Sequence, residues 1–286
     1  MRYRFIDAHR GRWPVRTLCD ALHVGPAGYY AWRDRPPSPR EQRRSALRGE
    51  IAAIHARVKA RYGSPRVHAE LVGRGHPCCV NTVAKIMREA GIAAKTQRKF
   101  RHTTDSNHDR PVAPNVLDRQ FDAAGPNQAW VADITFVPTR EGWLYLAVVE
   151  DLFARRVVGW SMDARMTSRL VVDALAMAVR RRLPGAELLA HSDRGSQYAS
   201  EHYQRLLGEH GITCSMSRRG DCYDNAPMES FFASLKKELT HHEDYATRAQ
   251  AKASIFEDIE VFYNRERRHS TLGYQSPADY EAARTG

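Results

Sequence analysis

An almost unbroken apolar run over residues 129–137 constrains the fold of this chain more than any other feature of its sequence. A run without polar alternation is typical of a strand that other elements cover on both faces. Asp133 interrupts the run, and a buried carboxylate is costly unless a partner or a metal ion compensates its charge. The run therefore predicts an α/β domain whose central strand carries either a hydrogen-bonded core acid or a functional one.

Further strands and helices are predicted after this run. Apolar segments between turn signals place strands at residues 144–149, 156–160, 187–191 and 212–216. Helices are expected from Thr167, over residues 201–209 and after residue 224. This order predicts the fold class, a ribonuclease-H-like α/β core with a mixed five-stranded sheet and flanking helices.

The charge of the chain is divided unevenly along its length. Residues 1–120 carry 24 Lys and Arg against 10 Asp and Glu, whereas residues 121–286 carry 20 against 23. A basic front predicts a polyanionic partner, nucleic acid before others. No apolar run approaches the roughly 20 residues of a membrane helix, and the first residues lack the apolar core of a signal peptide. We therefore expect a cytoplasmic protein without a membrane partner.

Helical periodicity predicts a small helical domain ahead of the core. One helix begins near residue 39 and carries an apolar stripe, Leu47, Ile51, Ile54 and Val58. Ser64-Pro65 and Asn81 are the expected starts of two shorter helices. Residues 64–91 are thus predicted to be helix-turn-helix-like, within a helical, basic DNA-binding region over residues 1–94.

Two more regions complete the expected organisation. Lys85 and Arg88 lie on the outward face of the last short helix and are expected to contact DNA, with a bundle of merely solvated cations as the alternative. Residues 95–124 are predicted to be a basic linker, either a cationic strap across phosphates or a solvated connection. Residues 125–286 form the α/β core, a C-terminal helix and a basic tail.

Three acids stand out by their positions. Asp133 lies inside a strand, Asp193 directly follows one, and Glu229 lies in the first turns of a helix. Taken singly, each has a structural explanation, as a core acid, a turn residue and a helix N-terminal charge. Their occurrence in that order favours a shared site. Lys236 lies two turns beyond Glu229, where it suits a phosphate backbone.

Clustered carboxylates suit metal-dependent phosphodiester chemistry. Two Mg²⁺ ions can activate a nucleophile near neutral pH and stabilise the leaving oxygen. Hard oxygen ligands favour Mg²⁺ over zinc. A group of possible zinc ligands near residue 70 lacks a standard spacing: His68, His76, Cys78 and Cys79.

The spacing of the acids is that of a known family. The 35 residues between Asp193 and Glu229 match the DD(35)E spacing of DDE transposases and retroviral integrases. The chain resembles the second reading-frame product of bacterial insertion sequences of the insertion-sequence-three type. Six segments carry this resemblance: residues 15–24 (VRTLCDALHV), 28–32 (GYYAW), 130–136 (WVADITF), 191–198 (HSDRGSQY), 225–236 (NAPMESFFASLK) and 263–277 (YNRERRHSTLGYQSP).

The resemblance implies an activity and a site. Asp133, Asp193 and Glu229 would be the metal-binding catalytic triad of an integrase catalytic core, with two Mg²⁺ ions for which Mn²⁺ can substitute. Water would cut a phosphodiester at the element's end, and the freed 3′-hydroxyl would attack a second one without a covalent enzyme–DNA intermediate.

The resemblance also implies partners. These are double-stranded DNA, both element ends and target, further copies of this chain as a homo-oligomer on DNA, and the upstream helix-turn-helix protein of the same element. The expected compartment is the bacterial cytoplasm, in association with the nucleoid.

Basic residues beyond the helical front are the remaining candidate DNA contacts. Arg218 and Arg219 lie in the loop before the Glu229 helix, and the alternative there is an unconstrained surface loop. A second basic group follows a C-terminal helix, where helix-end capping is the alternative: Arg267, Arg268 and His269.

Two other functions remain open from the sequence. A ribonuclease-H-like nuclease or resolvase would cut DNA without joining it. A non-catalytic DNA-binding regulator of a longer transposase would do neither. The motif near the C-terminus counts against the first, and the intact acid triad counts against the second.

Overall fold

A mixed five-stranded sheet forms the centre of the C-terminal region. The computed structural model describes residues 1–95, 112–218 and 222–285. The strand order is β3-β2-β1-β4-β5, in which β1 pairs antiparallel with β2 and parallel with β4. The strands are β1 (Ala129–Thr139), β2 (Gly142–Asp151), β3 (Arg156–Asp163), β4 (Leu189–Ser192) and β5 (Thr213–Met216). The predicted five strands are thus confirmed, with shifts of a few residues at their ends.

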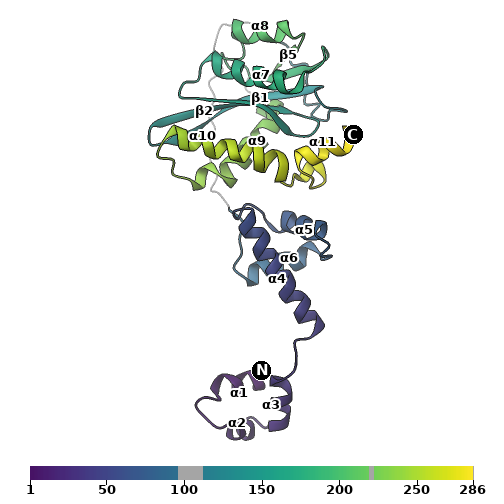
Figure 1. Cartoon of the computed structure of the whole chain (residues 1–286), viewed down its shortest axis with the longest axis vertical. Helices are drawn as coiled ribbons and strands as arrows, with labels where there is room; N and C mark the ends of the chain where they lie inside the picture. The colour runs from purple at the N-terminus through teal and green to yellow at the C-terminus, as the bar shows by residue number, and fades with distance from the viewer. Residues whose placement is uncertain (96–111, 219–221, 286) are drawn as a thin grey trace.

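Helices cover both faces of this sheet (Figure 1). One face carries α7 (Ser168–Arg182) and α8 (Glu201–Glu209). The other carries α9 (Ala226–Glu238), α10 (Arg248–Glu257), the π-helical segment η3 (Asp258–Glu266) and α11 (Pro277–Thr285). Because side chains alternate along β1, Val131 packs with the α9 side and Trp130 with the α7 side. The apolar run of β1 is therefore explained by burial on both faces.

The front of the chain forms two helical groups with separate cores. The first comprises α1 (Arg2–His9), α2 (Val15–Ala21) and α3 (Pro26–Arg33), and the second α4 (Pro39–Arg57), α5 (Ser64–Gly73) and α6 (Val80–Glu89). Ile6, Leu18 and Tyr29 are buried in the first core, and Ile51 and Val67 in the second. The sequence predicted the second group in outline and left the first unresolved.

Two predicted helix starts differ from the structure. Cys79, not Asn81, is the residue before α6, and Gly63 rather than Ser64 precedes α5. Neither helix has a side-chain cap; Pro65 lies in the first turn of α5, where its fixed backbone angle suits a helix, and Val83 of α6 is buried. No helix within residues 1–95, 112–218 and 222–285 has the length and apolar character needed to cross a membrane.

The second helical group is joined to the sheet-containing region by buried ion pairs. Arg61 of the α4–α5 connection lies 2.8 Å from the Asp258 carboxylate, and both side chains are buried. Arg268 lies 2.8 Å from Glu70 on α5. Charges removed from water need such partners, so these contacts fix α4–α6 against η3 and the residues after it.

Candidate active site

Parallel pairing of β1 with β4 brings two of the three predicted acids together. Ala132 on β1 lies opposite Ser192, the last residue of β4, so Asp133 inside β1 and Asp193 directly after β4 lie next to each other. The Asp193 carboxylate accepts a hydrogen bond of 2.8 Å from the Gly195 N–H, which holds it at the end of β4. A Cβ at residue 195 would lie 2.9 Å from that carboxylate oxygen, so glycine leaves room for the carboxylate in this position.

The third acid reaches the same region from α9. Glu229 is in the first turn of this helix and is exposed, while Met228 and Phe231 anchor the helix in the core beneath the sheet. Asn225 precedes the helix without capping it. Its side-chain amide instead donates a hydrogen bond of 3.3 Å to the Ala132 carbonyl. This bond ties the start of α9 to the strand residue next to Asp133.

Electrostatics link the three carboxylates. Burial raises the pKa of Asp133 well above its ordinary value, and the negative charges of Asp193 and Glu229 raise it further. The Ile134 N–H, 2.7 Å from the Asp133 carboxylate, and the Lys236 ammonium oppose these effects without cancelling them. Asp133 therefore lies where a positive charge would be strongly favoured.

Two further side chains complete the surroundings of Asp133. The Lys236 ammonium lies 5.4 Å from the centroid of the Phe136 ring, and burial lowers the pKa of this lysine. Tyr198 is buried, and within the described residues its hydroxyl has no hydrogen-bond partner. Its pKa is raised by burial and by the charges of Asp133 and Asp193. The sequence placed Lys236 here and missed Tyr198, although it ends the motif that contains Asp193.

The arrangement is open rather than a closed cage. Among the residues that the structure describes, no three His, Cys, Asp or Glu side chains converge as a ready-made metal site. The structure places Asp133, inside β1, next to Asp193 at the end of β4, and Glu229 acts electrostatically on Asp133. Such a site can hold a cation when water or a substrate supplies further oxygen ligands.

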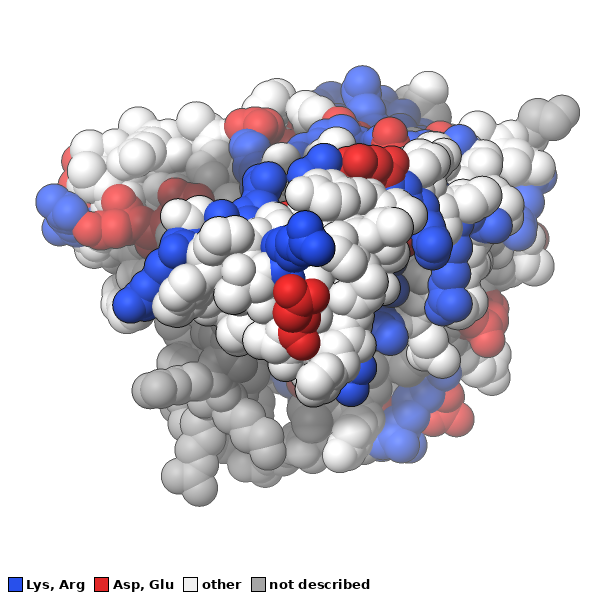
Figure 2. Space-filling view, turned by 90° about the horizontal axis from the view of Figure 1, so that it is seen from below, with Lys and Arg blue, Asp and Glu red and all other residues white. Residues whose placement is uncertain are grey.

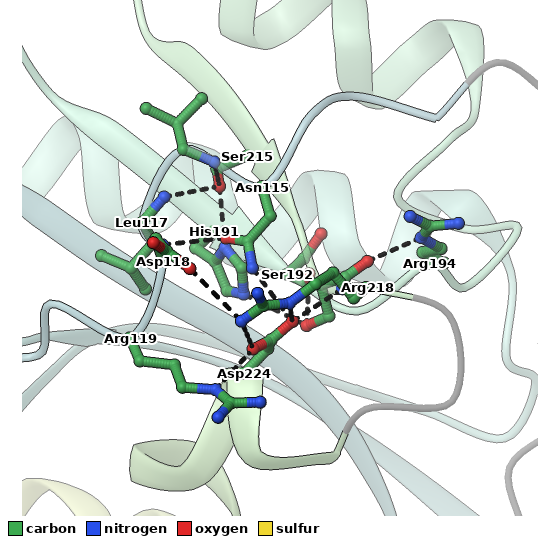
Figure 3. Close-up of polar contacts among 12 residues, drawn as sticks. Asn115, Leu117, Asp118, Arg119, His191, Ser192, Arg194, Ser215, Arg218 and Asp224 are labelled. Atoms are coloured by element: carbon green, nitrogen blue, oxygen red, sulfur yellow. Dashed lines mark hydrogen bonds and ion pairs between the residues drawn. The ribbon is translucent and has the colours of Figure 1, made fainter.

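A second buried aspartate next to this site was missed by the sequence. Asp224 lies directly before Asn225, is fully buried, and accepts hydrogen bonds from Arg218, Arg119 and Asn115 (Figure 3). The Arg218 guanidinium holds the pKa of Asp224 well below its ordinary value, against the effect of burial. Asp224 thereby fixes the chain that enters α9 against residues 115–119, more than a hundred positions earlier.

His191 is a buried neutral residue rather than a carboxylate partner. One ring nitrogen lies 2.9 Å from Ser215 Oγ (Figure 3), and the other lies 3.1 Å from Ser217 Oγ. Burial lowers the pKa of His191 to about 4, so the ring is uncharged near neutral pH. It joins β4 to the residues after β5.

The residues expected to contact DNA differ in their exposure and in their ion pairs. Lys85 and Arg88 are exposed on α6, as predicted. Arg218 is half-exposed but paired with Asp224, so the loop before α9 is not an unconstrained one at this residue. Arg219 lies outside the described residues, as do residues 96–111 of the predicted linker.

For Arg267 the structure contradicts the expected phosphate contact. Its side chain is 3% exposed and lies 2.7 Å from the Glu238 carboxylate, so it holds α9 to the end of η3. Arg268 pairs with Glu70, and burial lowers the pKa of His269 to about 4. A phosphate contact stays a prediction for Arg268 and, in its neutral form, for His269.

Comparison with family models agrees with this architecture. Residues 123–222 and residues 210–277 match two models described as an integrase core domain. Residues 42–100 match a model described as an HTH-like domain. The first two ranges include all three acids, and the third includes α5 and α6.

Solved structures with similar backbones come from viral integrases. One is the simian T-cell lymphotropic virus intasome in complex with the PP2A regulatory subunit B56 gamma, with 16% identity and a TM-score of 0.47. That match covers 81% of this chain and 74% of the other. Another is the HTLV-2 integrase catalytic core domain in complex with magnesium, with 16% identity, a TM-score of 0.43, and coverage of 56% and 99%.

Curated relatives match over nearly the whole chain. Transposase InsF for insertion sequence IS3A of Escherichia coli (strain K12) is 46% identical over 283 residues, which is 98% of each chain. The insertion element IS600 uncharacterized 31 kDa protein of Shigella sonnei is 46% identical and covers 92% of this chain and 97% of its own length. This chain therefore belongs to the IS3 family of insertion-sequence transposases, with an integrase core domain, and its function is DNA transposition.

Proposed function

We propose that Asp133, Asp193 and Glu229 are the metal-binding catalytic carboxylates of this transposase. The observation that carries the proposal is the electrostatic state of Asp133. Its pKa is raised by burial and by two neighbouring acids, whereas Asp224, a buried aspartate nearby, is compensated by two arginines. A carboxylate whose charge is disfavoured by burial and by neighbouring acids is expected where a cation binds.

The residues present fit Mg²⁺. This ion usually takes one or two protein carboxylates and completes its shell with waters and substrate phosphates. Asp133 and Asp193 supply two carboxylates side by side, and Glu229 is within reach on α9. We expect the site to bind two Mg²⁺ ions and to accept Mn²⁺ in their place. Bound metal would supply a nucleophile active near neutral pH and stabilise the leaving oxygen.

The chain's own side chains would orient the DNA. Lys236 lies on α9, two turns after Glu229, and its charge acts on Asp133, so it suits a phosphate next to the reacting one. Lys85 and Arg88 on α6 suit phosphates further along the duplex. Asp224 and Asn225 would keep Glu229 in register with β1 through their contacts at the start of α9.

The substrate that follows is double-stranded DNA, at the element's ends and at the target. A homo-oligomer on DNA would bring two ends together, with the upstream helix-turn-helix protein of the same element as a further partner. The compartment would be the bacterial cytoplasm, in association with the nucleoid. We also propose the domain division of residues 1–94, 95–124 and 125–286.

A strand-transfer assay tests the proposal. Purified protein is incubated with labelled element ends, Mg²⁺ or Mn²⁺, and a target duplex, for the wild type and for Asp133→Asn, Asp193→Asn and Glu229→Gln. Joined products are expected from the wild type and from none of the three variants. Glu150→Gln is the matched control, because Glu150 is a buried acid of the same sheet that contacts Tyr263 rather than the site.

Each other outcome contradicts part of the proposal. Wild-type joining by any one of the three variants would remove that residue from the site. Cleavage without joining by the wild-type chain would indicate a nuclease or resolvase. DNA binding without either reaction would indicate a regulator of a longer transposase.

A further inference from the structure

The first helical group contains a helix pair with the dimensions of a DNA-reading motif. α2 and α3 are joined by only four residues, Leu22 to Gly25. A helix-turn-helix has a connection of three or four residues, and its second helix enters the major groove. The pair α5–α6 has a longer connection of six residues, 74–79. The HTH-like family match begins at residue 42 and so does not include α2 and α3.

The turn between α2 and α3 is fixed by its own residues. His23 has a left-handed backbone with φ of 51°, and the Val24 N–H donates a hydrogen bond of 3.0 Å to the Cys19 carbonyl. Val24 packs on the core of the group. Gly25 precedes α3 and Pro26 begins it, which sets the direction of this helix.

One face of α3 is held inward by α1. Tyr29 is buried and donates a hydrogen bond of 2.9 Å to Asp7. A Cβ at Gly28 would lie 2.5 Å from the Tyr3 hydroxyl, so glycine at this position allows α1 and α3 to pack closely. Trp32 packs on the same core.

The opposite face of α3 is left exposed. Ala27, Tyr30 and Ala31 are all exposed, and Tyr30 shows 42% of its surface. The Arg33 guanidinium lies 4.9 Å from the Tyr30 ring centroid. Small residues beside a tyrosine and an arginine give a helix face that can approach base edges closely and contact phosphates.

The charge of this group fits DNA. Residues 1–35 contain seven arginines, no lysine or glutamate, and three aspartates. Two of the aspartates are already engaged, Asp7 with Arg10 and Asp34 with Arg33. Figure 2 looks at the end of the molecule that carries α1–α3, and more blue than red lies on the near surface. A net positive charge of this size draws a duplex to the exposed helix.

We propose that α2 and α3 form a helix-turn-helix whose exposed α3 face, Ala27, Tyr30 and Ala31, reads double-stranded DNA in the major groove. This inference rests on the proposed function in one respect: the DNA that α3 reads is taken to be the end of the element. It adds a second DNA-binding unit ahead of the HTH-like domain, and it separates sequence reading from the chemistry of the carboxylates.

The test measures DNA binding by the full chain without any cleavage step. Fluorescence anisotropy compares a duplex cut from the terminal sequence of the element with a shuffled duplex of the same composition. The probe variant is Ala27→Glu. Glutamate near the start of α3 favours the helix through its dipole, so the variant is expected to fold, while its charge opposes a phosphate backbone. Ala8→Glu on α1 is the control with the same change at another exposed alanine.

We expect Ala27→Glu to weaken binding of the terminal duplex by about tenfold or more, and Ala8→Glu by less than about threefold. Tyr30→Ala should lower the preference for the terminal over the shuffled duplex. Circular dichroism and thermal unfolding establish that each variant folds. If Ala27→Glu does not fold, Tyr30→Ala still tests the proposal.

Three results would overturn the inference. One is equal weakening by Ala27→Glu and Ala8→Glu, which indicates a general charge effect. Another is wild-type preference for the terminal duplex in both folded α3 variants. The third is unchanged DNA binding with lost self-association or lost binding of the upstream protein, which would make the α3 face a protein interface. Failure of the proposed function is seen separately, as absent cleavage by a chain that still binds the duplex.

Discussion

Two aspartates near the start of the same helix show opposite electrostatics. Asp133 faces two other carboxylates, and its pKa is raised by burial and by their charges. Asp224 faces Arg218 and Arg119, and its pKa is held well below the ordinary value. Both lie close to the start of α9. Asp133 follows Ala132, whose carbonyl accepts a hydrogen bond from Asn225, and Asp224 directly precedes Asn225 in the sequence.

The difference is the one expected between a structural acid and the metal-binding acid that we propose. A buried carboxylate with arginine partners is already compensated, so it fixes the chain around it. A buried carboxylate among other acids is compensated only when a cation arrives, which costs stability in the metal-free protein. Partner identity, rather than burial, is therefore the useful criterion at this end of the sheet.

The largest expected effect comes from Asp193, the acid that directly follows β4 next to Asp133. Asp193→Asn should lower the rate of strand cleavage by more than about 100-fold, because losing a ligand costs more than losing an outer-shell contact. Single-turnover cleavage of a labelled element end in Mg²⁺ measures this. A rate within about tenfold of the wild type would break the comparison, because Asp193 would then be a turn residue.

Removing the compensated acid should act on both stability and rate. Asp224→Asn leaves two guanidinium groups without their carboxylate and should lower the free energy of unfolding by about 2 kcal/mol, less than a fully buried pair because both arginines are half-exposed. Urea denaturation measures this value. Cleavage should fall by about 10- to 100-fold through misplacement of Glu229, with unchanged Mg²⁺ dependence. Lost Mg²⁺ dependence would instead place Asp224 among the ligands.

The role of Lys236 is tested with its neighbour as a matched control. Lys236→Met should lower cleavage by about tenfold, because a charge-assisted phosphate contact is lost while the aliphatic stem is kept. Lys237→Met removes the same charge from the exposed next residue of α9 and should change the rate by less than about twofold. Parallel cleavage assays compare them. Equal losses would show that Lys236 acts through net charge alone.

A smaller effect is expected from a third buried acid, Glu150. Burial raises its pKa from 4.5 to about 8. Because the unfolded chain releases this proton first, wild-type stability should fall as pH rises from about 4.5 to about 8. In Glu150→Gln the decrease in Tm over this pH range should be smaller by a few degrees than in the wild type, and activity should be unchanged. Thermal unfolding across this pH range measures it, and an unchanged slope would show that Glu150 is charged in the folded chain.

The three acids could be singled out from the sequence because local signals mark each of them. Asp133 interrupts an apolar strand, Asp193 precedes a glycine turn at a strand end, and Glu229 begins an amphipathic helix. The alternation of strands and helices likewise fixed the five-stranded sheet in advance. Patterns of two to four residues are what single-sequence reasoning resolves.

The rest depends on contacts between distant segments. Asp224 pairs with Arg119, 105 positions earlier, and Arg267 is buried against Glu238 on another helix. Neither pairing leaves a local pattern, so Arg267 was wrongly expected on a phosphate. The helices α1, α2 and α3 have only 8, 7 and 8 residues, and packing rather than propensity stabilises helices of that length.

The most direct test of the central claim is the Mg²⁺ dependence of thermal stability in three chains. Mg²⁺ should raise the Tm of the wild type and of Asp224→Asn, because both keep Asp133 and the neighbouring acids whose repulsion a bound cation relieves. Asp133→Asn should have a higher Tm than the wild type without Mg²⁺ and show no rise when Mg²⁺ is added. A rise in Asp133→Asn equal to that of the wild type would contradict a metal site at this aspartate.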